Sequence, residues 1–240
     1  MVRSASVVVF LLVWEAVGRL GDARRVPPAS EVFVRLVVEL ITPEFWAAAW
    51  TTLSALAIGL AISIVGGIAF GMAFGVRRNV AEVSRLYIGF LIAVPIAPLI
   101  PLLVAVFGLG PAVRVAAIVI FSFPMVAEYT IAGIHAISPS VLDMARSFRV
   151  PPVRRFLRLL IPGAVPGIMT GIRLGVGRAV IGMVVAELII VSTGIGALLK
   201  RYQATFDPVG VFALVIVFLA VGLLLVQLVS FAERRFLVWR

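Results

Sequence analysis

The chain has 240 residues, of which 62% are hydrophobic and only 13% are charged. Soluble domains are roughly 45–50% apolar and about 25% charged, so this composition indicates a protein that lies in a lipid bilayer. The formal charge of +10 does not point to nucleic acid, because basic residues beside apolar stretches typically set membrane topology. The sequence has no cysteine, which excludes a disulfide framework.

Six apolar stretches follow along the chain, each near the ~20 residues that cross a bilayer as a helix. They cover residues 4–20, 51–76, 86–107, 115–137, 166–191 and 209–231. The first could instead be a signal peptide, because Arg3 precedes an apolar run that ends in small residues. Trp14 and Glu15 make a poor cleavage region, which favours a retained helix. The sequence therefore predicts an all-α membrane protein with six spans in one domain, residues 1–240.

The arginines predict the orientation of these spans. If the N-terminus lies inside, twelve arginines fall on the cytoplasmic side and seven basic residues on the outer side. Loops rich in Lys and Arg stay in the cytoplasm, so we expect both termini to be cytoplasmic. An even number of spans agrees with this orientation.

The third and fourth spans contain the first candidates for a solute pathway. Pro95 and Pro98 free backbone carbonyls, which membrane proteins tolerate only inside a bundle or beside a water-filled cavity. They predict either a kinked packing helix or unwound backbone that lines a pathway. Glu128 is an acid in the fourth span and could line the same cavity.

The predicted cytoplasmic loop, residues 138–165, is rich in arginine and proline. Ser138 can cap a short helix that starts at Pro139, and Pro151 and Pro152 can start a second one. The second has an apolar stripe at i, i+3, i+4 and i+7, formed by Val153, Phe156, Leu157 and Leu160. The periodicity alone leaves three uses open: a helix on lipid headgroups, a solvated anchor of the loop, or a helix that docks into another protein.

The fifth span carries charges and a series of glycines. Arg178 and Glu187 each cost at least ~2.5–3.5 kcal/mol near the bilayer centre, so they face the bundle or water. They either form ion pairs with other helices or line a pathway for an anionic solute. Gly167, Gly171 and Gly175 recur every four residues and form one stripe, which we expect to lie against another helix.

The sequence lacks the residues of common catalytic and metal sites. It contains no G-x-x-x-x-G-K-[ST] motif for a nucleotide phosphate, and its one histidine, His135, has no cysteine to join it at a metal. We therefore expect no catalytic residues, no metal and no cofactor in this chain. Any ATP must bind to a partner.

The loop also contains a recognisable order of residues. Asp143-Met144-Ala145, then Leu160-Ile161-Pro162, then Ala164 to Gly167 together resemble the EAA loop of ABC importer permeases. The stretches "GIMTGIRLGVGRAVIGMVVAEL", "WEAVGRLGDARRVPPASEVF" and "VPIAPLIPLLVAVFGLGP" are similar to the branch that handles nitrate, sulfonate, taurine, bicarbonate and related solutes. The resemblance covers nearly the whole chain.

The resemblance implies the type I permease fold, with six transmembrane helices and short coupling helices between helices 4 and 5. It implies a bacterial inner-membrane permease, not itself an enzyme, that pairs with a second copy. Its other partners would be two ABC ATPases, which bind ATP and Mg, and an extracytoplasmic solute-binding protein. The residues implied in ATPase coupling are Asp143, Met144, Ala145, Arg149, Arg154, Phe156, Leu157 and Pro162.

Two departures from the family pattern stand out. Asp143-Met144-Ala145 replaces Glu-Ala-Ala, and Arg149 replaces the turn glycine, although a left-handed turn is about 1 kcal/mol cheaper for glycine. Two other classes of function stay open: a secondary transporter driven by an ion gradient, and a membrane-embedded enzyme. The sequence does not name the solute.

Overall fold

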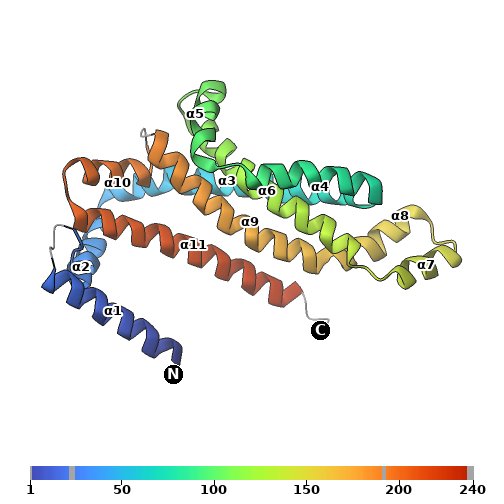
Figure 1. Cartoon of the computed structure of the whole chain (residues 1–240), viewed down its shortest axis with the longest axis horizontal. Helices are drawn as coiled ribbons and strands as arrows, with labels where there is room; N and C mark the ends of the chain where they lie inside the picture. Colours follow the sequence, from blue (N-terminus) through green and yellow to red (C-terminus); the bar gives the residue numbers. More distant parts are fainter. Residues whose placement is uncertain (1, 22–24, 191–192, 237–240) are drawn as a thin grey trace. The chain divides into compact units, whose positions relative to one another are not determined.

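The structure is a computed structural model that describes residues 2–21, 25–190 and 193–236. Its regular elements in these ranges are all helical, which confirms the predicted all-α fold (Figure 1). They are α1 (Val2–Leu20), α2 (Ala29–Leu40), α3 (Pro43–Gly75), α4 (Arg78–Ala93), α5 (Ile96–Phe107), α6 (Pro111–His135), α7 (Pro139–Ser147), α8 (Pro152–Arg155), a π-helical turn (Phe156–Leu160), α9 (Ile161–Ile190), α10 (Ile195–Ala204) and α11 (Pro208–Phe236).

Three helices, α3, α6 and α11, are long and apolar enough to cross a membrane. Two bent pairs, α4 with α5 and α9 with α10, also qualify if each pair counts as one span. The described residues thus support up to five of the six predicted spans by length and composition. The first predicted span does form α1, but its 19 residues include three charged ones, Arg3, Glu15 and Arg19.

The chain forms two compact units. Unit 1 consists of Met1–Ser54 and Glu187–Val221, and unit 2 consists of Ala55–Ala186 and Gly222–Arg240. The helices α3, α9 and α11 each contribute residues to both units. The sequence predicts a single permease domain over residues 1–240. That prediction concerns the unit that works in transport, and it stays a prediction.

In unit 1, Trp14 connects three helices. Its indole N–H donates to the carbonyl of Pro27 at 3.1 Å, and its ring lies 6.4 Å from that of Phe33 in α2 and 6.0 Å from that of Phe212 in α11. An aromatic residue suits this place because its ring packs against apolar neighbours while its polar end finds a partner.

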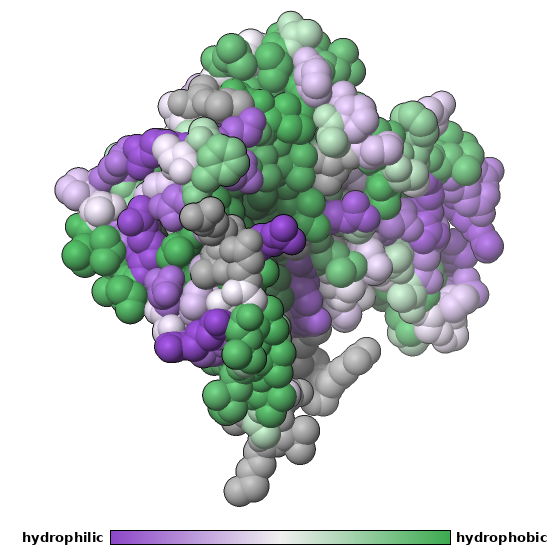
Figure 2. Space-filling model, turned by 60° about the vertical axis from the view of Figure 1, so that its left-hand side comes forward, coloured by the Kyte–Doolittle hydropathy of each residue, from purple (hydrophilic) through white to green (hydrophobic). Residues whose placement is uncertain are grey.

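In unit 2, α6 is the central helix. α4 and α9 run alongside it (Figure 1). The glycines of α3 let the backbone of α3 approach α6 closely. A Cβ atom on Gly67 or Gly71 would come within 2.7 Å of Val126 or 2.5 Å of Thr130. Small residues allow this close packing, which replaces the hydrophobic effect inside a bilayer. Large apolar side chains cover much of the molecular surface (Figure 2), as expected for helices that face lipid.

Candidate functional site

The predicted loop forms two short helical segments, α7 and α8, at one end of unit 2 (Figure 1). They start at Pro139 and Pro152, as the prolines predict. Ser138 is the N-cap residue of α7, but its hydroxyl lies 2.7 Å from that of Ser140 and does not cap the backbone. The prediction of a side-chain cap was therefore wrong, although the helix begins where expected.

The second segment is not a separate helix, which corrects the predicted loop end at residue 165. Helical backbone continues from Pro152 through the π-helical turn and into α9. Proline at 162 cannot donate to the carbonyl four residues earlier. The wider turn just before it, in which the Ile161 N–H bonds to the Phe156 carbonyl, accommodates this break without ending the helix.

Arg149 adopts the left-handed conformation of the turn after α7, with φ of 50°. The Val150 N–H bonds to the Ala145 carbonyl at 3.0 Å, and the Arg149 N–H bonds to the Arg146 carbonyl at 2.9 Å. This pair of bonds is the Schellman motif, which usually has glycine at the left-handed position. The turn is thus the one that a glycine would make, formed by an arginine.

The loop has an inner and an outer apolar face. Phe156 and Leu160 pack inward on the cluster around Met72, Ile134 and Ile168. Phe148, Val153 and Leu157 point outward and are 77%, 70% and 55% exposed. The single stripe predicted for docking is therefore divided: Phe156 belongs to the core of the permease, and Phe148, which the pattern did not single out, belongs to the outer face.

The other residues predicted for coupling lie around this outer face. Met144, Arg154 and Pro162 are exposed, and Ala145 is the buried residue of α7. Asp143 accepts a hydrogen bond of 3.0 Å from Arg146, one turn further along the same helix. An exposed pair of this kind contributes little to stability and leaves both side chains free to exchange partners.

The predicted glycine stripe of α9 lies against α6. A Cβ atom on Gly167 would be 2.5 Å from the Cα of Gly133, and one on Gly171 would be 2.9 Å from the Cβ of Tyr129. One on Gly175 would be 3.0 Å from the side chains of Ser122 and Val126. The two helices therefore approach each other closely at three positions over about two turns.

Arg178 lies at the edge of this stripe, seven residues or about two turns after Gly171. It is partly buried and forms no hydrogen bond or ion pair with the residues that the structure describes. Its neighbours Leu174 and Ile181 are exposed, and a Cβ atom on Gly177 would meet nothing within 4 Å. A guanidinium without a partner at this depth needs water, a solute or another subunit to compensate its charge.

The two prolines of the third predicted span lie at and after a sharp bend. Pro95 is the N-cap residue of α5, and the axes of α4 and α5 differ by 102°. Both Pro95 and Pro98 are exposed. The stretch is thus broken into two helices. Pro95 has no backbone N–H, so it cannot donate a helical hydrogen bond at the break.

The two acids predicted for the pathway have partners within the protein. Glu128 accepts hydrogen bonds of 2.7 and 2.5 Å from Arg85, which connects α6 to α4. Glu187 is 1% exposed and accepts from the Thr52 hydroxyl at 2.7 Å and from the Gly196 N–H at 2.9 Å. These contacts give both acids partners within the protein, in line with the structural alternative, and their place in a solute pathway stays a prediction.

Sequence reasoning missed a polar cluster in unit 1. The Tyr202 hydroxyl donates to the buried Glu39 at 2.5 Å, and Arg35 lies 3.0 Å from Glu39 and 3.4 Å from Asp207. Burial alone would lower the pKa of Arg35, but Tyr202 and the two acids raise it above its ordinary value. The i, i+4 spacing of Arg35 and Glu39 on a short helix could have indicated the pair.

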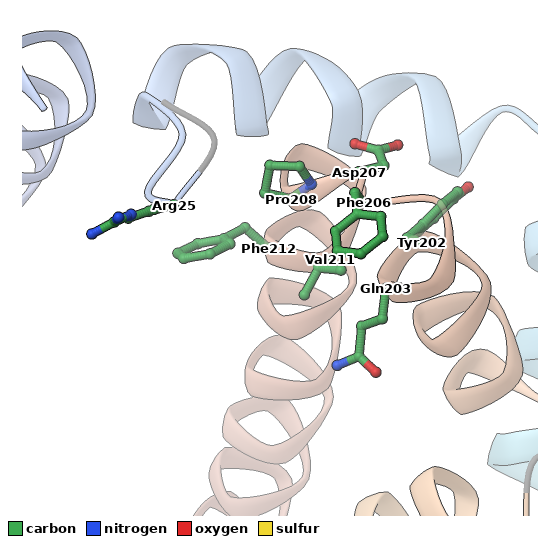
Figure 3. A pocket seen from close by; sticks show the side chains of 8 residues that line it. All are labelled: Arg25, Tyr202, Gln203, Phe206, Asp207, Pro208, Val211 and Phe212. Carbon is green, nitrogen blue, oxygen red and sulfur yellow. The ribbon is translucent and has the colours of Figure 1, made fainter. Parts of the chain in front are cut away.

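A cavity of about 610 Å³ lies beside this cluster, lined by residues of α10 and α11 together with Arg25 (Figure 3). Phe206, in the turn between the two helices, is 91% exposed and has φ of 53°. Left-handed backbone is rare for a bulky residue. This turn therefore holds an aromatic ring on the surface at a cost in backbone energy.

The structure defines a class of protein: a multi-pass helical membrane protein with an exposed, partly apolar loop. In the described ranges no group of three His, Cys, Asp or Glu residues could hold a metal ion. Residues 63–238 match the family described as the binding-protein-dependent transport system inner membrane component. The chain belongs to this family and is a permease subunit of an ABC importer, not an enzyme. The family implies ATPase and solute-binding-protein partners.

Several relatives align with almost the whole chain. A probable ABC transporter permease of Haemophilus influenzae is 27% identical over 96% of this chain and 94% of its own length. The putative aliphatic sulfonates transport permease SsuC of Bacillus subtilis is 26% identical over 97% and 85%. The formylaminopyrimidine transport permease ThiX of Halalkalibacterium halodurans is 27% identical over 96% and 92%.

A solved structure shares the fold. The crystal structure of an amino acid ABC transporter with histidines superimposes with a TM-score of 0.65 at 21% identity, covering 85% of this chain and 98% of that one. At this identity the likeness concerns the fold alone.

Proposed function

We propose that two copies of this chain form the solute pathway of the importer and that the outer face of the loop couples them to the ATPases. The observation that carries the proposal is the exposure of Phe148, Val153 and Leu157 on a segment between charged residues. Apolar side chains at such spacing fit a groove in a protein partner, as amphipathic helices do. ATP and Mg bind to the partner ATPase, and both termini lie in the cytoplasm with it.

The experiment compares a double variant with a single one. Phe148→Asp with Leu157→Asp should release the ATPases during affinity purification while the permease still inserts, because both side chains point outward. Phe156→Asp should instead destabilise the permease itself, because Phe156 packs on the core. Retention of the ATPases by the double Asp variant would overturn the proposed docking face.

For the solute, the proposal is a small anionic or polar compound such as a sulfonate, nitrate or bicarbonate. Arg178 supports it, because its charge has no partner among the described residues and lies in the middle of α9. The SsuC relative, named for aliphatic sulfonates, also supports an anionic solute. ATP-dependent uptake of labelled sulfonate, nitrate and bicarbonate by the reconstituted complex, with a labelled cation for comparison, tests this choice, and a preference for the cation would refute it.

The exposed turn at Phe206 is the surface we assign to the extracytoplasmic binding protein, since the predicted topology places residues 193–208 outside. Phe206→Gly would relax the left-handed backbone and remove the ring. We expect a slightly more stable permease with lower uptake at limiting concentrations of the binding protein. Unchanged uptake in that assay would remove Phe206 from this contact.

A further inference from the structure

Unit 2 contains a second cavity, of about 590 Å³, at the base of the loop. Residues from α3, α4, α6, α7 and α8 line it, among them Gly75, His135 and Arg155. Gly75 and His135 are the last residues of α3 and α6, two helices that meet the criteria for membrane spans. The His135 Nε2 atom lies 3.0 Å from the Gly75 carbonyl and joins the two ends. The cavity therefore lies at the level where spanning helices leave the hydrocarbon.

Four guanidinium groups line this cavity, and three of them have carboxylate partners. Arg78 lies 3.3 Å from Glu82, Arg85 lies 2.5 Å from Glu128, and Arg146 lies 3.0 Å from Asp143. Arg155 differs: it is half-buried and has no hydrogen-bond or ion-pair partner within the described part of the chain. A partly desolvated cation without an anion is costly, so this site favours an anionic ligand.

Glu82 and Asp143, the partners of Arg78 and Arg146, line the cavity with His135, and the rest of its wall is mostly apolar. Ile134, Ile137, Leu142 and Leu160 line it next to the arginines. A free inorganic anion would gain nothing from these side chains, whereas the glycerol and upper acyl carbons of a lipid would bury apolar area on them. The outward residues Phe148, Val153 and Leu157 do not line the cavity, so the face assigned to the ATPase is a different surface.

We propose that this cavity binds an anionic phospholipid, with its headgroup phosphate on Arg155 and its upper acyl carbons on Ile137 and Leu142. Basic pockets between spanning helices on the cytoplasmic side suit such headgroups. A lipid held there contacts the ends of α3 and α6 as well as α7 and α8. It therefore connects the coupling loop to the spanning helices and supports the loop in its docking position.

The test uses the full-length chain, purified in detergent and stripped of lipid. Cardiolipin, phosphatidylglycerol, phosphatidylcholine and inorganic phosphate are added separately, and native mass spectrometry measures which remain bound. Phosphatidylcholine has the same phosphate, but its choline cation cancels the net charge, so we expect the two anionic lipids to be retained about tenfold better, a ratio that corresponds to ~1.4 kcal/mol. The unfolding temperature of the protein should also rise when either of these two lipids is added.

Three variants assign the effect to Arg155. Arg155→Gln should lower retention of the anionic lipids about tenfold, and Arg155→Lys should keep part of it because the charge remains. Arg158→Gln is the matched control, because Arg158 is exposed on the same segment and does not line the cavity. All three substitutions leave the buried cluster around Leu160 unchanged, so each protein should stay monodisperse.

Three results would overturn the proposal. Equal lipid retention by Arg155→Gln and the unsubstituted chain would show that the lipid binds elsewhere. If inorganic phosphate raised the unfolding temperature as much as the lipids do, the cavity would be a site for free anions. Loss of bound lipid when the ATPases are added would show that the cavity receives a segment of the partner protein.

Discussion

Two faces of α9 differ in what covers them. Along one face, Gly167, Gly171 and Gly175 lie at backbone distance from α6. Along the adjoining face, Leu174 and Ile181 are exposed and Arg178 has no partner among the described residues. In a bilayer, helices associate through close packing of small residues. The comparison teaches that the glycine face holds the subunit together, and it leaves the arginine face for water, solute or a second copy.

The largest expected effect tests the glycine face with a single methyl group. Gly167→Ala places a Cβ atom 2.5 Å from the Cα of Gly133, and backbone atoms cannot rotate away. The helices must separate, which should destabilise the permease by about 1–3 kcal/mol or more. Thermal unfolding in detergent measures this loss.

Gly177→Ala is the matched control, because a Cβ atom there meets nothing within 4 Å. It should leave stability unchanged or raise it by up to about 1 kcal/mol through helix propensity. Equal effects of the two substitutions would remove the distinction between the faces.

The next effect concerns Glu187, at the end of α9 in unit 1. Glu187→Leu removes the acceptor for the Thr52 hydroxyl and the Gly196 N–H, both of which stay buried. Each unsatisfied donor costs about 1–3 kcal/mol, so the unfolding temperature should fall clearly. Glu187→Gln keeps one carbonyl acceptor and should cost less. If Glu187→Leu unfolded at the same temperature as the original chain, these hydrogen bonds would not stabilise the fold, and a role for Glu187 in the pathway would be favoured.

Arg178→Ala tests the open face and should affect transport more than stability. If the guanidinium faces an anionic solute, ATP-dependent uptake into proteoliposomes should fall about tenfold, the value of one charge-assisted contact. The unfolding temperature should not change, because Arg178 has no partner in the described chain. Arg178→Lys should retain part of the uptake. A fall in stability with normal uptake per folded molecule would place Arg178 in packing instead.

The smallest expected effect lies in the loop before α9. Arg149→Gly relieves the left-handed backbone at φ of 50° and should stabilise the turn by about 1 kcal/mol. The Schellman hydrogen bonds do not involve the side chain, so ATPase coupling should persist. Uncoupled ATP hydrolysis in this variant would show that the arginine side chain makes a contact of its own.

Much of the loop was predictable because proline and helix caps act locally. Pro139 and Pro152 begin helical segments as expected, since each proline fixes its own backbone and lacks a donor. The end of the loop was not predictable in the same way. The loop was predicted to end at residue 165, but the π-helical turn before Pro162 lets the helix continue into α9.

The sequence by itself determined the properties that depend on composition and near neighbours. These are the bilayer as solvent, the all-helical fold, the glycine stripe and the family. The tertiary structure decided which side of each helix is covered. It turned Phe156 inward, paired Glu128 with Arg85 across 43 residues, and joined Glu187 to Thr52 across 135 residues. Such pairs depend on how distant segments pack, and spacing along one helix carries no information about its partner.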